Sequence, residues 1–293
     1  MRQCAKFIFA VFTIFGLFSS IALAADERTK CNKKKTFCIQ VIKDKETAAF
    51  YALNKMDYIQ TVSIDLTMKN MFLVTPNHAY FEVSPSERKQ LFTLQRKNQG
   101  AWKYKYTFFV QTGSASTHHD DSYIYQLPYE VGQKYRVSQS CHGSFSHSHE
   151  GSKFALDFVM KEGTPVHAAR SGRVIDLYEY SIVSGQSSID YRFSNYVLIQ
   201  HDDFTIAGYH HLKTNGVAVK KGDFVDTGQM IGYSGTSGYS TGPHLHFVVK
   251  KPVSGKFSKS IEVRFATSSG VKQCMKKGEA YFAVKTDASH FSM

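Results

Sequence analysis

The stretch GYSGTSGYSTGPHLHF, residues 232–247, decides the fold and chemistry of the second half of this 293-residue chain. It ends in an apolar strand pattern, and residues two apart in a strand face the same side. His244 and His246 are therefore expected to point together, with Leu245 and Phe247 in the opposite layer. The four glycines and the proline before them predict a loop whose backbone approaches a ligand closely. Two hydrogen-bonded structural histidines are the alternative interpretation.

Upstream segments supply the further ligands that a metal site needs. Residues 145–158, FSHSHEGSKFALDF, contain two histidines and then Asp157, in an apolar strand pattern where an unpaired carboxylate is costly. Residues 209–212, YHHL, end another apolar strand pattern. A catalytic zinc takes three protein ligands and leaves a fourth position to water, whose pKa falls to about 7. One histidine of the first segment, Asp157 and one of the pair at 244 and 246 fit as ligands, and the other histidines fit acid, base or transition-state roles.

In their order and spacing these segments resemble the lysostaphin-type, LytM-like family of zinc endopeptidases, which cut peptide cross-links in bacterial peptidoglycan. The resemblance covers roughly residues 130–262 and also includes 163–166, 168–174 and 195–197. It implies an antiparallel β-sheet peptidase domain, one Zn²⁺ per chain and a peptidoglycan peptide as substrate.

The resemblance also implies roles for individual residues. The implied site consists of the metal ligands His147, Asp157 and His246 and the catalytic residues His211 and His244. The sequence departs from the family's usual His-x-x-x-Asp spacing because position 153 is lysine, so the first ligand must come from further back. His147 is preferred because it stands in the Phe-Ser-His context of members with a longer hairpin, and His149 is the competing ligand.

The remaining histidines are expected to have structural or solvent-exposed roles. Only one of His210 and His211 is expected to face the metal, because adjacent strand residues face opposite ways. His167 is expected to be structural, and His201, at the end of a strand pattern, to face solvent or a turn. Residues 118–121, His-His-Asp-Asp, are read as a solvated loop within the linker 113–121. No partner is predicted for the histidines at positions 78, 142 and 290.

The first half of the chain has a different pattern. Its aromatic, valine and threonine content favours strands, so the whole protein is expected to be mostly β. Short strands are predicted at 39–42, 61–66, 71–75, 79–83 and 104–111. Their spacing is typical of a β-sandwich. The predicted organisation is a signal peptide at 1–24, an N-terminal β-sandwich-like domain at 25–128, the zinc peptidase domain at 129–262 and a C-terminal tail at 263–293.

Residues 1–24 have the pattern of a secretory signal: a basic start, an apolar run and Ala-Leu-Ala before the predicted cleavage site. Export to the periplasm or the extracellular space follows, with no stable membrane insertion after cleavage. Four cysteines remain in the mature chain, and an oxidising compartment favours two disulfides. Three pairings are possible, and Cys31–Cys38 with Cys141–Cys274 is the one predicted.

Composition narrows the function further. The formal net charge of +12 favours polyanionic partners, which for an exported protein are cell-wall polymers and lipid headgroups. No nucleic-acid-binding module is present in the sequence, so a nucleic-acid partner is not expected. The predicted function is a secreted zinc metalloendopeptidase acting on peptidoglycan cross-links. The alternatives are a non-catalytic LytM-like wall binder or activator of wall hydrolases, and a polyanion-binding β protein. The oligomeric state is left open.

Overall fold

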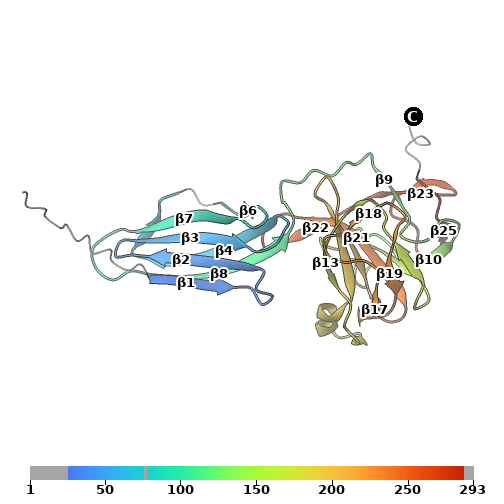
Figure 1. Cartoon of the computed structure of the whole chain (residues 1–293), viewed down its shortest axis with the longest axis horizontal. Helices are drawn as coiled ribbons and strands as arrows, with labels where there is room; N and C mark the ends of the chain where they lie inside the picture. Colours follow the sequence, from blue (N-terminus) through green and yellow to red (C-terminus); the bar gives the residue numbers. More distant parts are fainter. Residues whose placement is uncertain (1–25, 76–77, 287–293) are drawn as a thin grey trace, which may run out of the picture.

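The computed structural model describes residues 26–75 and 78–286, and it is almost entirely antiparallel β-structure, as predicted (Figure 1). The predicted signal peptide and His290 lie outside the described residues. Two groups of sheets lie side by side along the long axis of the molecule. Within the described ranges, no helix is long and apolar enough to cross a membrane.

The first group, here called the N-terminal module (residues 26–112), contains two sheets. The larger sheet has the order β1 (Asp26–Cys31), β2 (Phe37–Lys43), β3 (Thr47–Asn54), β7 (Arg88–Arg96) and β5 (Met71–Leu73). The smaller sheet has the order β6 (Phe81–Val83), β4 (Gln60–Lys69) and β8 (Lys103–Thr112). All five predicted strands overlap observed ones, whereas β1, β3 and β7 were not predicted.

The two sheets of the N-terminal module face each other across an aromatic core. Strict alternation along β3 buries every second side chain. Among these is Phe50, which stacks on Phe92 of its own sheet at 4.6 Å between ring centroids. It also meets Tyr104 and Tyr106 of the opposite sheet at 5.4 and 5.2 Å. These edge-on contacts between rings hold the sheets together.

The second group, here called the C-terminal module (residues 124–283), is built on one antiparallel sheet. Its order is β18 (Phe224–Val225), β13 (Gly172–Tyr178), β15 (Tyr196–Gln200), β16 (Ile206–His210), β21 (His244–Pro252), β11 (Leu156–Val159), β10 (Lys134–Gln139) and β25 (Ala280–Phe282), with β22 (Ser258–Ile261) also on β21. A three-stranded sheet contains β12 (Pro165–His167), β19 (Met230–Ser234) and β17 (Leu212–Val217). The remaining elements are β14 (Ser184–Gly185) paired with β20 (Gly238–Tyr239), the 3-10 helix η1 (Ser188–Phe193), and β9 (Ile124–Gln126) with β23 (Arg264–Thr267) and β24 (Gly270–Lys272).

One face of this central sheet is buried in a single hydrophobic cluster. Leu245 and Phe247 of β21 and Phe158 of β11 point into it, together with Val166 and Ile231 from the three-stranded sheet. Because strand residues alternate between faces, the residues between them are left on the opposite, open face. That open face carries the candidate site.

The segment from residue 263 packs into the same core. Phe265 of β23 contacts Phe247 at 5.7 Å between ring centroids, and β25 extends the central sheet beside β10. The disulfide between Cys141 and Cys274 ties this segment to the end of β10. The other disulfide, between Cys31 and Cys38, joins directly paired residues of β1 and β2. Both are the predicted pairings.

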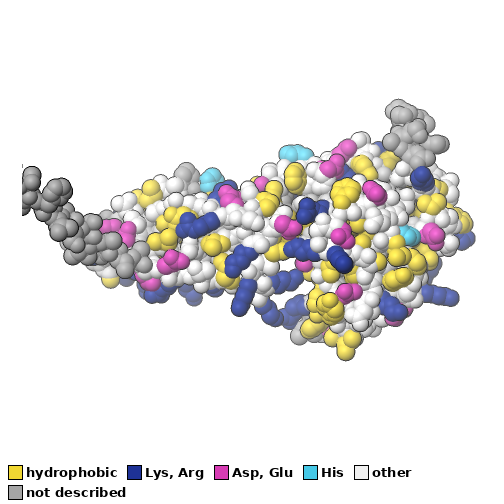
Figure 2. Space-filling view, viewed as in Figure 1, with side chains coloured by type: hydrophobic (Ala, Val, Ile, Leu, Met, Phe, Trp, Pro, Cys, Tyr) yellow, Lys and Arg dark blue, Asp and Glu magenta, His cyan; other side chains and the backbone are white. Residues whose placement is uncertain are grey.

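The two modules meet through a mixed polar and apolar interface. A minor apolar cluster joins Tyr58 of the N-terminal module to Ile175 and Ile206 of the C-terminal module. Around it, carboxylate oxygens of Asp57 lie 3.7 Å from Arg173 and 3.5 Å from Lys221. Lys and Arg side chains gather around this junction on the face shown in Figure 2. Such partly exposed ion pairs each contribute little stability.

Candidate active site

Three neighbouring strands bring polar residues together on the open face of the central sheet. In the antiparallel register of β11 and β21, Asp157 is directly opposite His246. In the register of β16 and β21, His210 is opposite the same His246. Side chains of directly opposed residues lie about 5 Å apart at Cβ. The sheet therefore sets a carboxylate and two imidazoles in one row.

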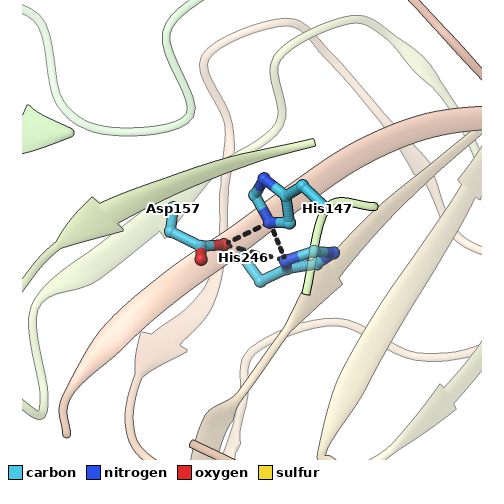
Figure 3. Close-up of side chains that lie close together, drawn as sticks. All are labelled: His147, Asp157 and His246. Carbon is cyan, nitrogen blue, oxygen red and sulfur yellow. Dashed lines mark hydrogen bonds and ion pairs between the residues drawn. The ribbon is translucent and has the colours of Figure 1, made fainter. Parts of the chain in front are cut away.

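A loop adds a third histidine, His147, above this row (Figure 3). His147, fully buried, follows β10 and approaches with its Nε2 3.2 Å from Asp157 Oδ1 and 3.3 Å from His246 Nδ1. His246 Nδ1 is 2.8 Å from the same Asp157 oxygen. A tetrahedral zinc with bonds of 2.0–2.1 Å separates its ligand atoms by about 3.3 Å. The three atoms thus have the spacing of a zinc ligand set.

The hydrogen bonds of His147 fit a metal ligand. Its Nδ1–H donates to the carbonyl of Ser140 at 2.9 Å, which leaves the lone pair on Nε2 directed at the other two residues. The second oxygen of Asp157 accepts a hydrogen bond of 2.9 Å from Gln139 Nε2. Gln139 was not predicted from the sequence. A register shift between Val137 and Gln139, a β-bulge, sets Gln139 opposite Asp157 on the open face.

The electrostatics of the three residues suit a cation. Burial alone raises the pKa of Asp157, but hydrogen bonds and charge interactions with His147 and His246 hold that pKa well below its usual range. Burial lowers the pKa of His246 against the opposing effect of Asp157. An ionised carboxylate at Asp157 and a neutral imidazole at His246 are the forms in which these groups bind metal.

Two further imidazoles, His211 and His244, lie beside this set. Their ring centroids are 4.6 Å apart, and His211 lies 5.8 Å from His246. The Nδ1–H of His211 donates to the carbonyl of Ser237 at 2.7 Å, and that of His244 donates to the carbonyl of Gly242 at 2.8 Å. In both residues Nε2 is left for proton transfer. Burial and the neighbouring His244 and His246 lower the pKa of His211 to about 3, so it is a neutral imidazole.

Both His210 and His211 lie on the open side of the sheet, so the strand alternation behind the expectation that only one faces the metal is broken at this point. β16 ends at His210, and His211 has a φ of 62°. This left-handed backbone is uncommon outside glycine and breaks the strand alternation, which turns His211 to the same side as its neighbour. The ring of His210 is 5.6 Å from that of His246.

Asp157, His210, His211, His244 and His246 line a groove of about 1090 Å³, whereas His147 is buried and is not among the lining residues. Ser240, Thr241 and Gly242, from the glycine-rich loop predicted to approach a ligand, form part of the groove wall. Every residue that lines this groove falls between 138 and 277, so the N-terminal module contributes no part of its wall.

The other candidate residues lie apart from the cluster. His149 is exposed on the groove wall, and the group of ligand atoms within 4.8 Å of one another contains His147 instead. His201 is buried, contrary to the prediction, because its Nδ1–H bonds the carbonyl of Ser171 in the core. In the linker, His119 stacks on Tyr125 at 6.1 Å between ring centroids.

A β-fold domain that gathers two histidines, an aspartate and further imidazoles in an open groove has the features of a metal-dependent peptidase. Residues 150–259 match the family model described as Peptidase family M23. This part of the C-terminal module is therefore similar to M23 peptidases, and the family resemblance predicted from the sequence is confirmed. His147 lies three residues before the matched range, whereas Asp157, His211, His244 and His246 lie within it.

Several known proteins with related sequences are named as endopeptidases, and some of these names specify peptidoglycan. Lysostaphin of Staphylococcus simulans is 41% identical over 97 residues, covering 33% of this chain and 18% of lysostaphin. Peptidoglycan DD-endopeptidase ShyA of Vibrio cholerae is 35% identical over 126 residues, covering 41% of this chain and 26% of ShyA. Glycyl-glycine endopeptidase ALE-1 of Staphylococcus capitis is 38% identical over 97 residues, with 24% of its length covered. Among solved structures, the catalytic domain of lysostaphin is 29% identical, with a TM-score of 0.30 and coverage of 48% of this chain and 87% of that domain. The chain thus spans about a quarter or less of the full length of lysostaphin, ShyA and ALE-1.

Proposed function

We propose that this protein is an exported zinc metalloendopeptidase that hydrolyses peptide cross-links of bacterial peptidoglycan. The observation that carries the proposal is the convergence of His147, Asp157 and His246, of which Asp157 and His246 line a groove together with His211 and His244. The names of the M23 relatives support the substrate class. We assign the peptidase domain to residues 129–262, with the segment from 263 packed on it, and the N-terminal β domain to 25–128.

In this proposal the ligands are His147 Nε2, Asp157 Oδ1 and His246 Nδ1. When bound, zinc supplies Lewis-acid activation of a water molecule and of the scissile carbonyl. Ser140 and Gln139 fix the orientation of the ligands, as hydrogen-bond partners of metal ligands generally do.

His211 and His244 carry out the proton transfers in this proposal. Each is held by a hydrogen bond from Nδ1–H to a backbone carbonyl, so protons are exchanged at Nε2. A neutral imidazole can accept the proton of the attacking water, and an imidazolium can return it to the departing amine or stabilise the oxyanion.

Export to the periplasm or the extracellular space is part of the proposal. The substrate lies outside the cytoplasmic membrane, and the sequence of residues 1–24 has a signal pattern. Two disulfides fit an oxidising compartment.

The experiment that tests the proposal is digestion of purified peptidoglycan with and without a chelator, followed by mass analysis of the released fragments. We expect fragments cut within the peptide cross-links, loss of cutting with the chelator, and recovery on adding zinc. The variant His246→Ala should retain neither zinc nor cleavage. Full cleavage by that variant, or stoichiometric zinc with no cleavage by the unaltered protein, would contradict the proposal; the second result is that of a non-catalytic wall binder.

A further inference from the structure

Lys250 occupies the groove-facing side of the strand that carries the His-Leu-His motif. Along β21, His244, His246, Val248 and Lys250 alternate with core residues, and all four line the groove. At about 3.3 Å per residue, the Cα of Lys250 is about 13 Å from that of His246. A lysine side chain spans roughly half of that distance. The ammonium of Lys250 therefore lies within the length of a few peptide residues from the proposed metal ligands.

The ammonium of Lys250 has no partner. Neither a hydrogen bond nor an ion pair joins it to any residue in the described part of the chain. Burial lowers the pKa of Lys250, and no carboxylate opposes this effect. Partly buried lysines are normally paired, because an unpaired charge away from water is costly. A lysine that has no carboxylate partner from the protein at this position is suited to bind a carboxylate of a ligand.

The charges of the residues that line the groove also favour an anionic ligand. Among the described residues that line it, Asp157 is the only carboxylate, and it belongs to the proposed metal site. Lys250 and the exposed Lys277 are the lining ammonium groups, and Lys277 also has no partner within the described ranges. Once Asp157 is committed to the metal, the rest of the groove carries net positive charge. Such a groove attracts anionic ligands.

The groove that Lys250 lines also offers hydrogen-bonding groups. Ser152 and Ser258 are among its lining residues. Lys250 pairs with Ser260 of β22 and with Ile206 of β16. Between Lys250 and the metal row, Gly208 lies opposite Val248, and the absence of a side chain on Gly208 leaves room for the imidazole of His210, whose Nε2 lies 2.6 Å from where a Cβ of residue 208 would be.

We propose that Lys250 binds a free carboxylate of the substrate within a few residues of the scissile bond, so that the groove selects acidic peptide cross-links over neutral oligoglycine bridges. This inference rests on the proposed peptidase function and names the substrate class for the same site. The relatives include both a glycyl-glycine endopeptidase and DD-endopeptidases, so the sequence match alone leaves the two classes open. Lys250 is a specificity residue in this proposal, and it takes no part in bond cleavage.

The test compares three synthetic peptides with the zinc-loaded full-length mature protein. The first carries a free carboxylate on the residue after the scissile bond, the second is identical except that this carboxylate is amidated, and the third is an oligoglycine. A charge-assisted hydrogen bond corresponds to about a tenfold to hundredfold effect on kcat/KM. We expect kcat/KM to fall by that factor on amidation, and Lys250→Met to bring the ratio between the acid and amide peptides close to one. Lys250→Arg should retain most of the preference.

The matched control is Lys259→Met, which removes the same charge from the adjacent strand β22. Lys259 is exposed and lies outside the groove lining. Its loss should leave the acid-to-amide ratio as in the unaltered protein. An equal kcat/KM for the acid and amide peptides with the unaltered protein, or an equal loss of preference in both lysine variants, would overturn the proposal.

A binding measurement separates this proposal from the peptidase function. Fluorescence anisotropy with labelled acid and amidated peptides, on metal-free protein, reports carboxylate recognition without cleavage. If no peptide is cleaved but the acid form binds more tightly and Lys250→Met removes the difference, the peptidase function fails and the carboxylate site stands. If cleavage occurs but neither binding nor kcat/KM depends on the carboxylate, the carboxylate site fails alone.

Discussion

Replacing Gln139 by methionine should weaken zinc binding while leaving all three proposed ligands in place. Gln139 Nε2 donates to Asp157 Oδ2 at 2.9 Å and to Ser146 Oγ at 2.7 Å. Its Oε1 accepts from the backbone N–H groups of Phe145 and Ser146 at 3.2 and 3.1 Å. One side chain therefore orients the metal carboxylate and holds the loop that carries His147. Methionine has a similar volume and can make none of these bonds.

The expected loss of zinc affinity follows from the groups that Gln139 contacts. Loss of a hydrogen-bond partner of a metal ligand typically costs 10- to 100-fold in metal affinity. That range corresponds to about 1.4 to 2.7 kcal/mol. Because Gln139 also anchors the His147 loop, we expect a value near the upper end.

The assay is the zinc dissociation constant, measured by competition with a chromophoric chelator, with circular dichroism to verify the fold. The matched control is Gln133→Met, an exposed position in the loop before β10, which should bind zinc as the unaltered protein does. A folded Gln139→Met variant with unchanged zinc affinity would refute the reasoning that this residue positions the metal site.

Three further predictions concern catalysis, pH and stability. His211→Ala and His244→Ala should each lower kcat by about 10²- to 10⁴-fold. The zinc content of each variant, measured by mass spectrometry, should stay at one ion per chain. Loss of zinc from either variant would show that the replaced histidine is a metal ligand. Burial lowers the pKa of His201 to about 4, so the folded protein favours its neutral form. The contribution of His201 to the free energy of unfolding is therefore complete above pH 6.5 and is lost as the pH falls toward 4. Urea unfolding should show a loss of about 2 kcal/mol at pH 5 relative to pH 7.5 that is absent in His201→Gln, and parallel curves for the two proteins would contradict this. Replacing both Cys141 and Cys274 by serine removes a link across 133 residues and should cost about 2 to 5 kcal/mol of unfolding free energy, read as a lower Tm by calorimetry; an unchanged Tm would show that the link adds no stability.

Strand alternation was enough to predict how part of the site is arranged. It set His244 and His246 on one face and Leu245 and Phe247 on the other, and the structure has them so. The same alternation gave Asp157 its position on the open face of β11. These side-chain directions depend only on local backbone geometry, which a sequence pattern encodes.

Other parts of the site depend on features that periodicity does not encode. The left-handed φ of His211 reverses the direction that strand alternation predicts. The bulge before Gln139 sets a polar side chain beside a carboxylate 18 residues away. A polar residue ending the strand-like pattern of 134–139 was the available signal, but its partner is fixed by the register of two strands. The burial of His201 likewise depends on a backbone carbonyl 30 residues away, at Ser171.

In the N-terminal module, too, the sequence pattern predicts some elements and not others. Predicted strands overlap β2, β4, β5, β6 and β8, while β1, β3 and β7 were missed. β1 is charged and exposed along most of its length, so it lacks the apolar alternation of a half-buried strand. It is fixed by pairing with β2 and by the Cys31–Cys38 disulfide.

The central claim is that His147, Asp157 and His246 hold the zinc of a peptidase site. The most direct measurement is a crystal structure of the zinc-loaded protein with anomalous diffraction collected at the zinc absorption edge. The account predicts one zinc peak per chain, bound by His147 Nε2, Asp157 Oδ1 and His246 Nδ1 at about 2.0–2.2 Å. A zinc ion bound by His149 in place of His147, or no zinc peak within reach of Asp157, would contradict it.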